Sequence, residues 1–150
     1  MKRIILAICI IACSLATQAQ NQIFSKYATM DGIGFVCINK AMFDLGTKFI
    51  SVAGGEDLSK LGALDKMLII SSESNDGKKK IDKDINALSN DKDYEVLMTS
   101  HSSGGDNMFI FTNKRKPHEF IIGTIEKEQS SMIVVVGNFT KEDISNFLNQ

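Results

Sequence analysis

The sequence predicts an α+β fold: a single domain with a largely antiparallel β-sheet, a C-terminal four-strand meander, and helices packed on the sheet. Four apolar runs follow one another from Tyr94 to Val136, separated by short polar turns, as in a meander of antiparallel strands. Ahead of them, Ile81, Ile85 and Leu88 recur at spacings of four and three, which places them on one face of a helix. Residues 20–150, which follow an N-terminal leader, number about 130. A chain of this length buries roughly two thirds of its unfolded surface, which is enough for one core.

The first residues have the pattern of a secretory signal. Two basic residues precede an apolar run from Ile4 to Ala12, and small and polar residues ending in Ala19 follow it. The run is too short for a membrane-spanning helix, which needs about 20 apolar residues. We expect cleavage between Ala19 and Gln20, so that residues 20–150 form the exported domain.

A second interpretation of the same segment stays open. Ile10-Ile11-Ala12-Cys13 resembles a lipobox, in which the signal ends at residue 12 and Cys13 becomes the lipidated first residue of an envelope lipoprotein. The apolar character continues past Cys13 to Ala16, which favours the ordinary signal. In both cases we expect an exported protein, periplasmic or associated with the outer membrane, that contacts a membrane only through a lipid anchor.

Removal of residues 1–19 leaves Cys37 as the only cysteine, so no internal disulfide can form. Cys37 lies in the apolar run Phe35–Ile38, and we therefore expect it to be buried as a small hydrophobic residue. A reactive or intermolecular thiol is the alternative.

The charge balance of the exported part is close to neutral. Without the two basic residues of the leader, 15 of the 17 Lys and Arg face 18 Asp and Glu, a net charge of -3 with both signs interspersed. Nucleic-acid binding requires a concentrated basic face, so we expect no nucleic-acid partner.

The N-terminal half of the predicted domain begins with a helix. We expect this helix over Asn21–Met30, a strand over Ile33–Asn39 and a short helical turn over Lys40–Leu45. From Thr47 to Leu64 the apolar pattern is interrupted by Gly54-Gly55, so we expect a loop with one helical turn there.

The continuous apolar run Met67–Ile70 predicts a buried strand, and the helix that contains Ile85 follows it and ends near Asn90. The strands of the meander are expected at Tyr94–His101, Met108–Thr112, Glu119–Ile125 and Met132–Val136. Thr140 and Asp143 resemble a capping box. This box would begin a closing helix whose apolar residues are Ile144, Phe147 and Leu148.

Several predicted strands are apolar at successive positions and therefore on both faces of the sheet. Helices around Ile85 and Ile144 can cover one face, and the N-terminal helix and the segment Thr47–Leu64 are candidates for the other. If they leave a face uncovered, a partner chain has to cover it, and that face is an interaction site.

No arrangement of residues predicts a catalytic group, a cofactor site or a metal site. His101, His118 and Cys37 lie far apart in the sequence, whereas metal ligands cluster. Gly32-Ile33-Gly34 precedes a strand and lacks the third glycine of a dinucleotide-binding fingerprint. His101 lies among serines, but it can act as a general base only if the fold places a carboxylate behind it.

We therefore expect a non-enzymatic module of the cell envelope that binds an envelope protein or a small ligand. One alternative is an enzyme whose site is assembled from dispersed polar residues around His101 or His118. Another is a structural or stress-related envelope protein. The oligomeric state stays open.

Several short patterns occur in a recognisable order: Lys26-Tyr27, Ile33–Phe43, Lys66–Glu73, Tyr94–Met98 and Val136–Phe139. In this order they resemble the family of domains of unknown function numbered 4252 (DUF4252). The resemblance implies a small single-domain protein exported to a Gram-negative envelope, with or without a lipid anchor. It implies no activity, because the family offers no catalytic residues to transfer to this sequence.

Overall fold

A computed structural model describes residues 22–45, 63–140 and 142–143 of the 150-residue chain. Several predictions fall outside these residues and stay predictions: the cleavage site between Ala19 and Gln20, lipidation of Cys13, most of the loop that begins at Thr47, and the helix that contains Ile144.

The chain divides into two units, residues 1–31 and 32–150. In the first unit, a short α-helix, α2 (Gln22–Ser25), continues into a 3-10 helix, η1 (Lys26–Thr29). The helix predicted for this region is therefore present, and its second half is wound more tightly than an α-helix.

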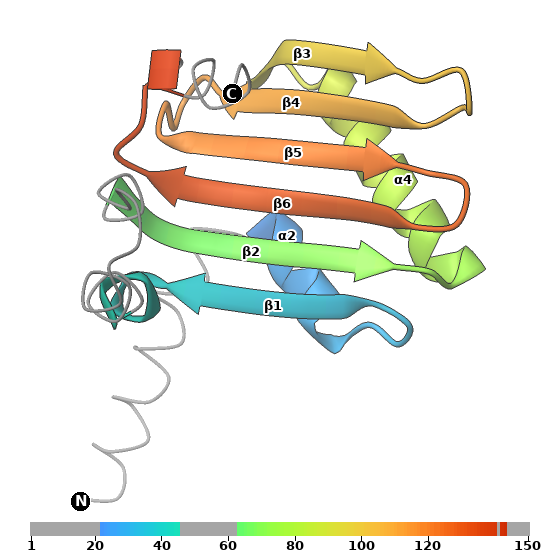
Figure 1. The fold of residues 1–150 in the computed structure, drawn as a ribbon, viewed down its shortest axis with the longest axis horizontal. Helices are drawn as coiled ribbons and strands as arrows, with labels where there is room; N and C mark the ends of the chain where they lie inside the picture. The colour runs from blue at the N-terminus through green and yellow to red at the C-terminus, as the bar shows by residue number, and fades with distance from the viewer. Residues whose placement is uncertain (1–21, 46–62, 141, 144–150) are drawn as a thin grey trace, which may run out of the picture. The chain divides into compact units, whose positions relative to one another are not determined.

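The second unit contains a six-stranded sheet in the order β1-β2-β6-β5-β4-β3 (Figure 1). The strands are β1 (Gly34–Asn39), β2 (Leu64–Ser72), β3 (Tyr94–His101), β4 (Asn107–Asn113), β5 (Glu119–Ile125) and β6 (Ser130–Gly137). All five neighbouring pairs are antiparallel, and β3 to β6 are neighbours in chain order. The predicted α+β class and the C-terminal meander are confirmed.

Strand β2 is longer than the sequence pattern predicts. It begins at Leu64, which pairs with Gly137 of β6 and is buried, and a register shift follows between Leu64 and Lys66. We expected Leu64 to belong to a loop, so that expectation was wrong. The local leucine spacing favours a helical turn at Leu64. Pairing with β6, which comes from the far end of the sequence, instead makes Leu64 part of a strand.

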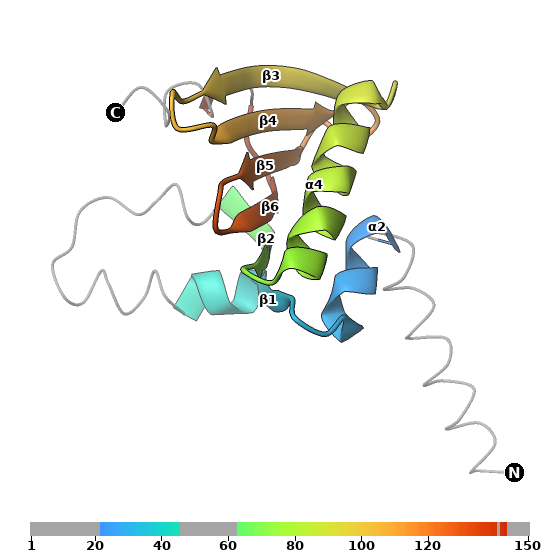
Figure 2. The ribbon, with the colours of Figure 1, turned by 90° about the vertical axis from the view of Figure 1, so that its right-hand side faces the viewer.

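Helix α4 (Asn75–Asn90) packs on one face of the sheet (Figure 2). The Oγ of Ser74 accepts a hydrogen bond from the Gly77 N–H at 3.2 Å and caps the helix. The predicted apolar stripe is confirmed, because Ile81, Ile85 and Leu88 are all buried.

The strand register assigns each side chain to a face of the sheet. A Cβ added at Gly123 would lie 3.0 Å from the Ile85 side chain, so Gly123 faces α4. Directly opposite residues of antiparallel strands share a face, and successive residues alternate. The core residues that share the face of Gly123 are each at most 2% exposed: Leu68, Ile70, Phe111, Ile121, Met132 and Val134.

Cys37 is exposed, so the expectation that it is buried was wrong. It lies in β1, which is an edge strand with one neighbouring strand, whereas α4 packs on β2, β6 and β3. The preceding residue in the strand, Val36, is 50% exposed. An apolar run therefore identified the strand correctly but did not show that it lies at the edge.

The predicted capping box is present. The Thr140 N–H donates to the Asp143 Oδ2 at 2.8 Å, and the Asp143 N–H donates to the Thr140 Oγ1 at 3.2 Å. This reciprocal pair is typical of the first turn of a helix. Among the described residues, no helix is both long and apolar enough to cross a membrane.

Candidate functional site

The two histidines considered as catalytic candidates lie at opposite ends of the sheet. His101 is the last residue of β3 and pairs with Asn107, which in turn pairs with Ile125 at the end of β5. His118 directly precedes β5 and therefore lies at the other end. Both side chains are exposed.

Among the described residues, neither histidine has the carboxylate that a general-base role requires. The His101 Nδ1 shares a hydrogen bond with the Asn107 Oδ1, and its ring lies edge-on to Phe109 with centroids 6.3 Å apart. In the part of the chain that the structure describes, no carboxylate pairs with His101 or His118. Within the same residues, no three His, Cys, Asp or Glu side chains form a group that could hold a metal ion.

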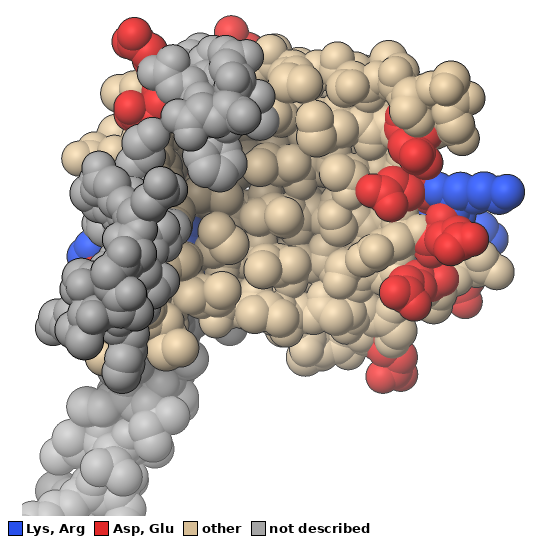
Figure 3. Space-filling model, viewed as in Figure 1, with Lys and Arg blue, Asp and Glu red and all other residues tan. Residues whose placement is uncertain are grey.

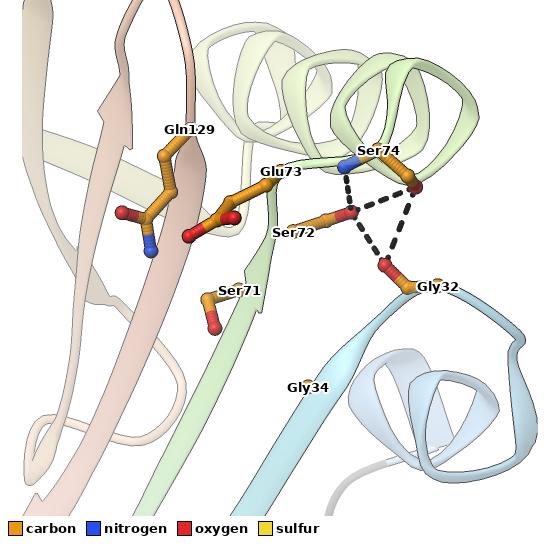
Figure 4. Close-up of a pocket in the computed structure, with 7 residues that line it drawn as sticks. All are labelled: Gly32, Gly34, Ser71, Ser72, Glu73, Ser74 and Gln129. Atoms are coloured by element: carbon orange, nitrogen blue, oxygen red, sulfur yellow. Dashed lines mark hydrogen bonds between the residues drawn. The ribbon is translucent and has the colours of Figure 1, made fainter.

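A polar cavity of about 300 Å³ lies where β1 begins, β2 ends and α4 begins (Figure 4). The residues that line it are Gly32, Gly34, Ser71, Ser72, Glu73, Ser74 and Gln129. The cavity thus lies between the start of β1 and the connection from β2 to α4.

The hydroxyl groups of the cavity are largely used within the protein. The Ser72 Oγ donates to the Gly32 carbonyl oxygen at 2.6 Å and accepts from the Ser74 N–H at 3.2 Å (Figure 4). The Ser72 and Ser74 hydroxyls lie 3.0 Å apart. These bonds hold the turn before β1 against the first turn of α4.

Two glycines make this close approach possible. A Cβ at Gly77 would lie 2.1 Å from the Ser72 Oγ, which leaves no room for a side chain. Gly32 has a φ of +74°, and a Cβ there would lie 2.8 Å from the Ser74 Oγ.

The cavity offers polar contacts but no activated nucleophile. Its serines would need an adjacent base to attack a substrate, and Glu73, the lining residue that could act as one, forms no hydrogen bond with them. Glu73 and Gln129 contribute the other functional groups, and Glu73 is exposed to solvent. The arrangement fits a structural role, in which the turn before β1 is held against the start of α4.

A buried polar cluster lies at the other end of the meander, on the α4 face. The Glu119 Oε1 accepts hydrogen bonds from the Asn113 Nδ2 at 2.9 Å and from the Tyr94 hydroxyl at 3.4 Å. Glu119 is only 4% exposed. Burial and, after it, the nearby Glu119 carboxylate raise the pKa of Tyr94 to about 12.

This cluster fixes the turn between β4 and β5. The Asn113 Oδ1 accepts from the N–H groups of Arg115 at 2.9 Å and Lys116 at 3.2 Å. No local pattern predicted the cluster, because Glu119 occupies the first position of an apolar strand, where a charged residue is usually exposed. Its role in the described contacts is structural.

The sheet face opposite α4, which we call the open face, is apolar across its centre. Its half-buried or exposed apolar residues are Val36, Ile38, Met67, Ile69, Met98, Met108, Ile122, Ile133 and Val135. Two further members, Ile110 and Phe120, are 1% exposed. In Figure 1 α4 lies behind the sheet, so Figure 3, drawn from the same side, shows the open face with an uncharged centre.

A family model described as "Domain of unknown function (DUF4252)" matches residues 27–147 and includes all six strands. The chain belongs to this family. The resemblance identified from its sequence patterns is therefore confirmed. Neither the search of the curated proteins nor the search of the solved structures gave a match.

The three features of this DUF4252 chain differ in what they leave available for binding. In the cavity, Ser72 and Ser74 bond to each other and to the main chain. In the buried cluster, Glu119 bonds to Tyr94 and Asn113. The open face keeps apolar surface in contact with solvent, and it is therefore the candidate binding surface.

Proposed function

We propose that this protein is an exported, non-enzymatic binding module of the cell envelope whose open face binds a protein partner. The observation that supports the proposal is the uncharged centre of a sheet face on which side chains such as Val36, Ile69 and Ile133 stay partly exposed (Figure 3). Partly exposed apolar side chains on neighbouring strands are typical of interaction sites.

The form of the surface favours a protein over a small ligand. Small-molecule sites are concave pockets, whereas the centre of the open face is formed by adjacent strands of a sheet. The cavity, which is concave, is lined by polar residues, and the hydroxyls of Ser72 and Ser74 are already bonded within the protein.

The charge at the border of the open face indicates the chemistry of the partner. Acidic side chains gather, around a basic side chain that projects between them, at the end of the sheet where β2 ends and β5 turns into β6 (Figure 3). Glu73, Glu126 and Glu128 are exposed at this end. We expect a partner with an apolar patch bordered by Lys or Arg, because interfaces place apolar contacts at the centre and complementary charges at the rim.

The location of the protein is tested by mass spectrometry of the mature N-terminus. A chain that begins at Gln20 indicates ordinary export, and a lipid on Cys13 indicates an anchored lipoprotein. A chain that keeps its first residues in the cytoplasm would contradict the proposal.

Site-specific photo-crosslinking in the envelope tests the binding surface. A photo-reactive phenylalanine derivative at Ile69 of the open face should form an adduct with one partner protein, and the same derivative at Lys83, exposed on α4, should not. The partner is then purified and titrated with the native protein and with the Ile133→Asp variant. We expect the charge at Ile133 to weaken binding about tenfold or more.

Three results would overturn the proposal. The adduct forms equally from Lys83 and Ile69; the purified partner binds the Ile133→Asp variant as tightly as the native protein; or the derivative at Ile69 reacts only within its own chain. Ile133→Thr serves as the milder variant if Ile133→Asp fails to fold, since threonine keeps the branched shape of a strand residue.

A further inference from the structure

The two edges of the sheet differ in how they are protected against pairing with another strand. The sheet order places β1 at one edge and β3 at the other. An edge strand presents unpaired N–H and C=O groups, and proteins usually block them with charges, prolines or bulges. Only one of the two edges has such features.

Strand β3 has two of these protective features. Its register with β4 shifts between Val96 and Met98, which indicates a bulge, and Glu95 places a charge beside it. A bulge bends the strand and interrupts the regular row of main-chain groups.

Strand β1 has none of them. Its six residues, Gly34–Asn39, pair with β2 in an unbroken register and include no charged residue and no proline. Val36 is 50% exposed and Cys37 is exposed. Within the described residues, no strand pairs with the outer edge of β1.

We propose that β1 pairs antiparallel with β1 of a second copy, so that two sheets join into one across a twofold axis. A strand edge can accept an added strand through main-chain hydrogen bonds alone. Two copies of β1 bring no like charges together, because the strand carries none. The joined sheet keeps the open faces of both copies on the same side.

Geometry allows two central registers. Opposite residues of antiparallel strands share a face, so the twofold axis passes between two copies of the same residue. Centred on Val36, the pairing sets Phe35 opposite Cys37 and Gly34 opposite Ile38. Centred on Cys37, it sets Val36 opposite Ile38 and the two thiols directly opposite each other, within reach of a disulfide.

Oxidative crosslinking of the mature protein tests the pairing and identifies the register. In the Cys37-centred register the native protein forms a disulfide-linked dimer, mapped to Cys37 by mass spectrometry. In the Val36-centred register the native thiols lie diagonally apart and stay unlinked, whereas a Val36→Cys variant that also carries Cys37→Ser is linked. A Met98→Cys variant with Cys37→Ser is the matched control on β3, and we expect it to stay monomeric.

Light scattering without crosslinking provides the second measurement. The native protein should have the mass of two copies at micromolar concentration, and Val36→Lys should weaken the dimer about tenfold while leaving the circular dichroism spectrum unchanged. Met98→Lys should leave the dimer intact. Monomeric native protein in which neither Cys37 nor Val36→Cys links, or linkage through Met98→Cys to the same extent, would overturn the proposal.

This inference goes beyond the proposed binding function, and the two can fail separately. Val36 also belongs to the open face, so Val36→Lys tests the dimer by light scattering of the protein alone. Ile133→Asp, on the inner strand β6, tests partner binding. A dimer that binds no partner retains this inference and contradicts the proposed function.

Discussion

The two faces of the sheet carry similar apolar side chains in different surroundings. Ile121 and Ile122 are adjacent residues of β5, yet Ile121 lies under α4 with 0% exposure and Ile122 is half-buried on the open face. The chemistry of the side chains is the same, so the difference comes from what packs on them. An apolar strand therefore indicates that burial of its side chains is favourable. It does not indicate which part of the chain or which partner molecule buries them.

The largest expected effect comes from truncating these two isoleucines. Ile121→Ala should lower the free energy of unfolding by about 4 kcal/mol, because it removes buried methyl groups and leaves a cavity under α4. Ile122→Ala, the matched control, should cost about 1 kcal/mol, since solvent already reaches part of that side chain. Chemical denaturation of both variants measures the difference. Equal losses would mean that the two faces are equally covered in solution.

A smaller effect is expected for the buried polar cluster on the α4 face. Glu119→Ala should cost about 2 kcal/mol, because the buried Tyr94 hydroxyl and Asn113 amide lose their shared acceptor. Glu119→Gln keeps a side-chain oxygen and should cost less. Denaturation midpoints compare the two variants, and a harmless Glu119→Ala would show that water replaces the carboxylate.

The same cluster predicts a dependence of stability on alkaline pH. The pKa of Tyr94 is raised from 10.0 to about 12 in the folded protein, so folding favours the protonated phenol. This stabilisation is fully present below pH 10.0 and is lost as the pH rises to about 12. At pH 11 about 1 kcal/mol of it remains. Unfolding measured from pH 9 to pH 12 should show this slope in the native protein and a shallower one in Tyr94→Phe. Identical slopes would contradict the assignment.

The smallest effect on stability is expected from polar substitution of the open face. A double variant, Ile69→Thr with Ile133→Thr, should change the free energy of unfolding by about 1 kcal/mol or less, because both side chains are only half-buried. It should nevertheless reduce the fluorescence of a hydrophobic dye bound to the native protein. Unchanged dye fluorescence would mean that the open face is not the apolar surface that solvent reaches.

Local sequence patterns predicted much of the fold. The spacing of Ile81, Ile85 and Leu88 identified α4, and the apolar runs from Tyr94 onward identified the meander, because both signals depend on residues close in sequence. The pairing of β2 with β6 was not predictable in this way. It joins residues such as Leu64 and Gly137, whose contact depends on the whole topology.

The functional features were predicted less completely. The sequence indicated that both sheet faces need cover, and the structure identifies the open face as the one away from α4. The contact of Tyr94 with Glu119 links strands that are not neighbours, so no local pattern reports it. The exposure of Cys37 follows from the edge position of β1, which also arises only from the strand order.

The strand order also has a consequence for how the chain reaches its native state. Within the sheet, the pair of β1 and β2 is hydrogen-bonded to the meander only through β6, the last of the six strands in the sequence. During synthesis, strand β2 therefore lacks its β6 partner until the residues from Ser130 onward have been made. Contacts so distant in sequence form slowly, and we expect stable folding to await release of the finished polypeptide.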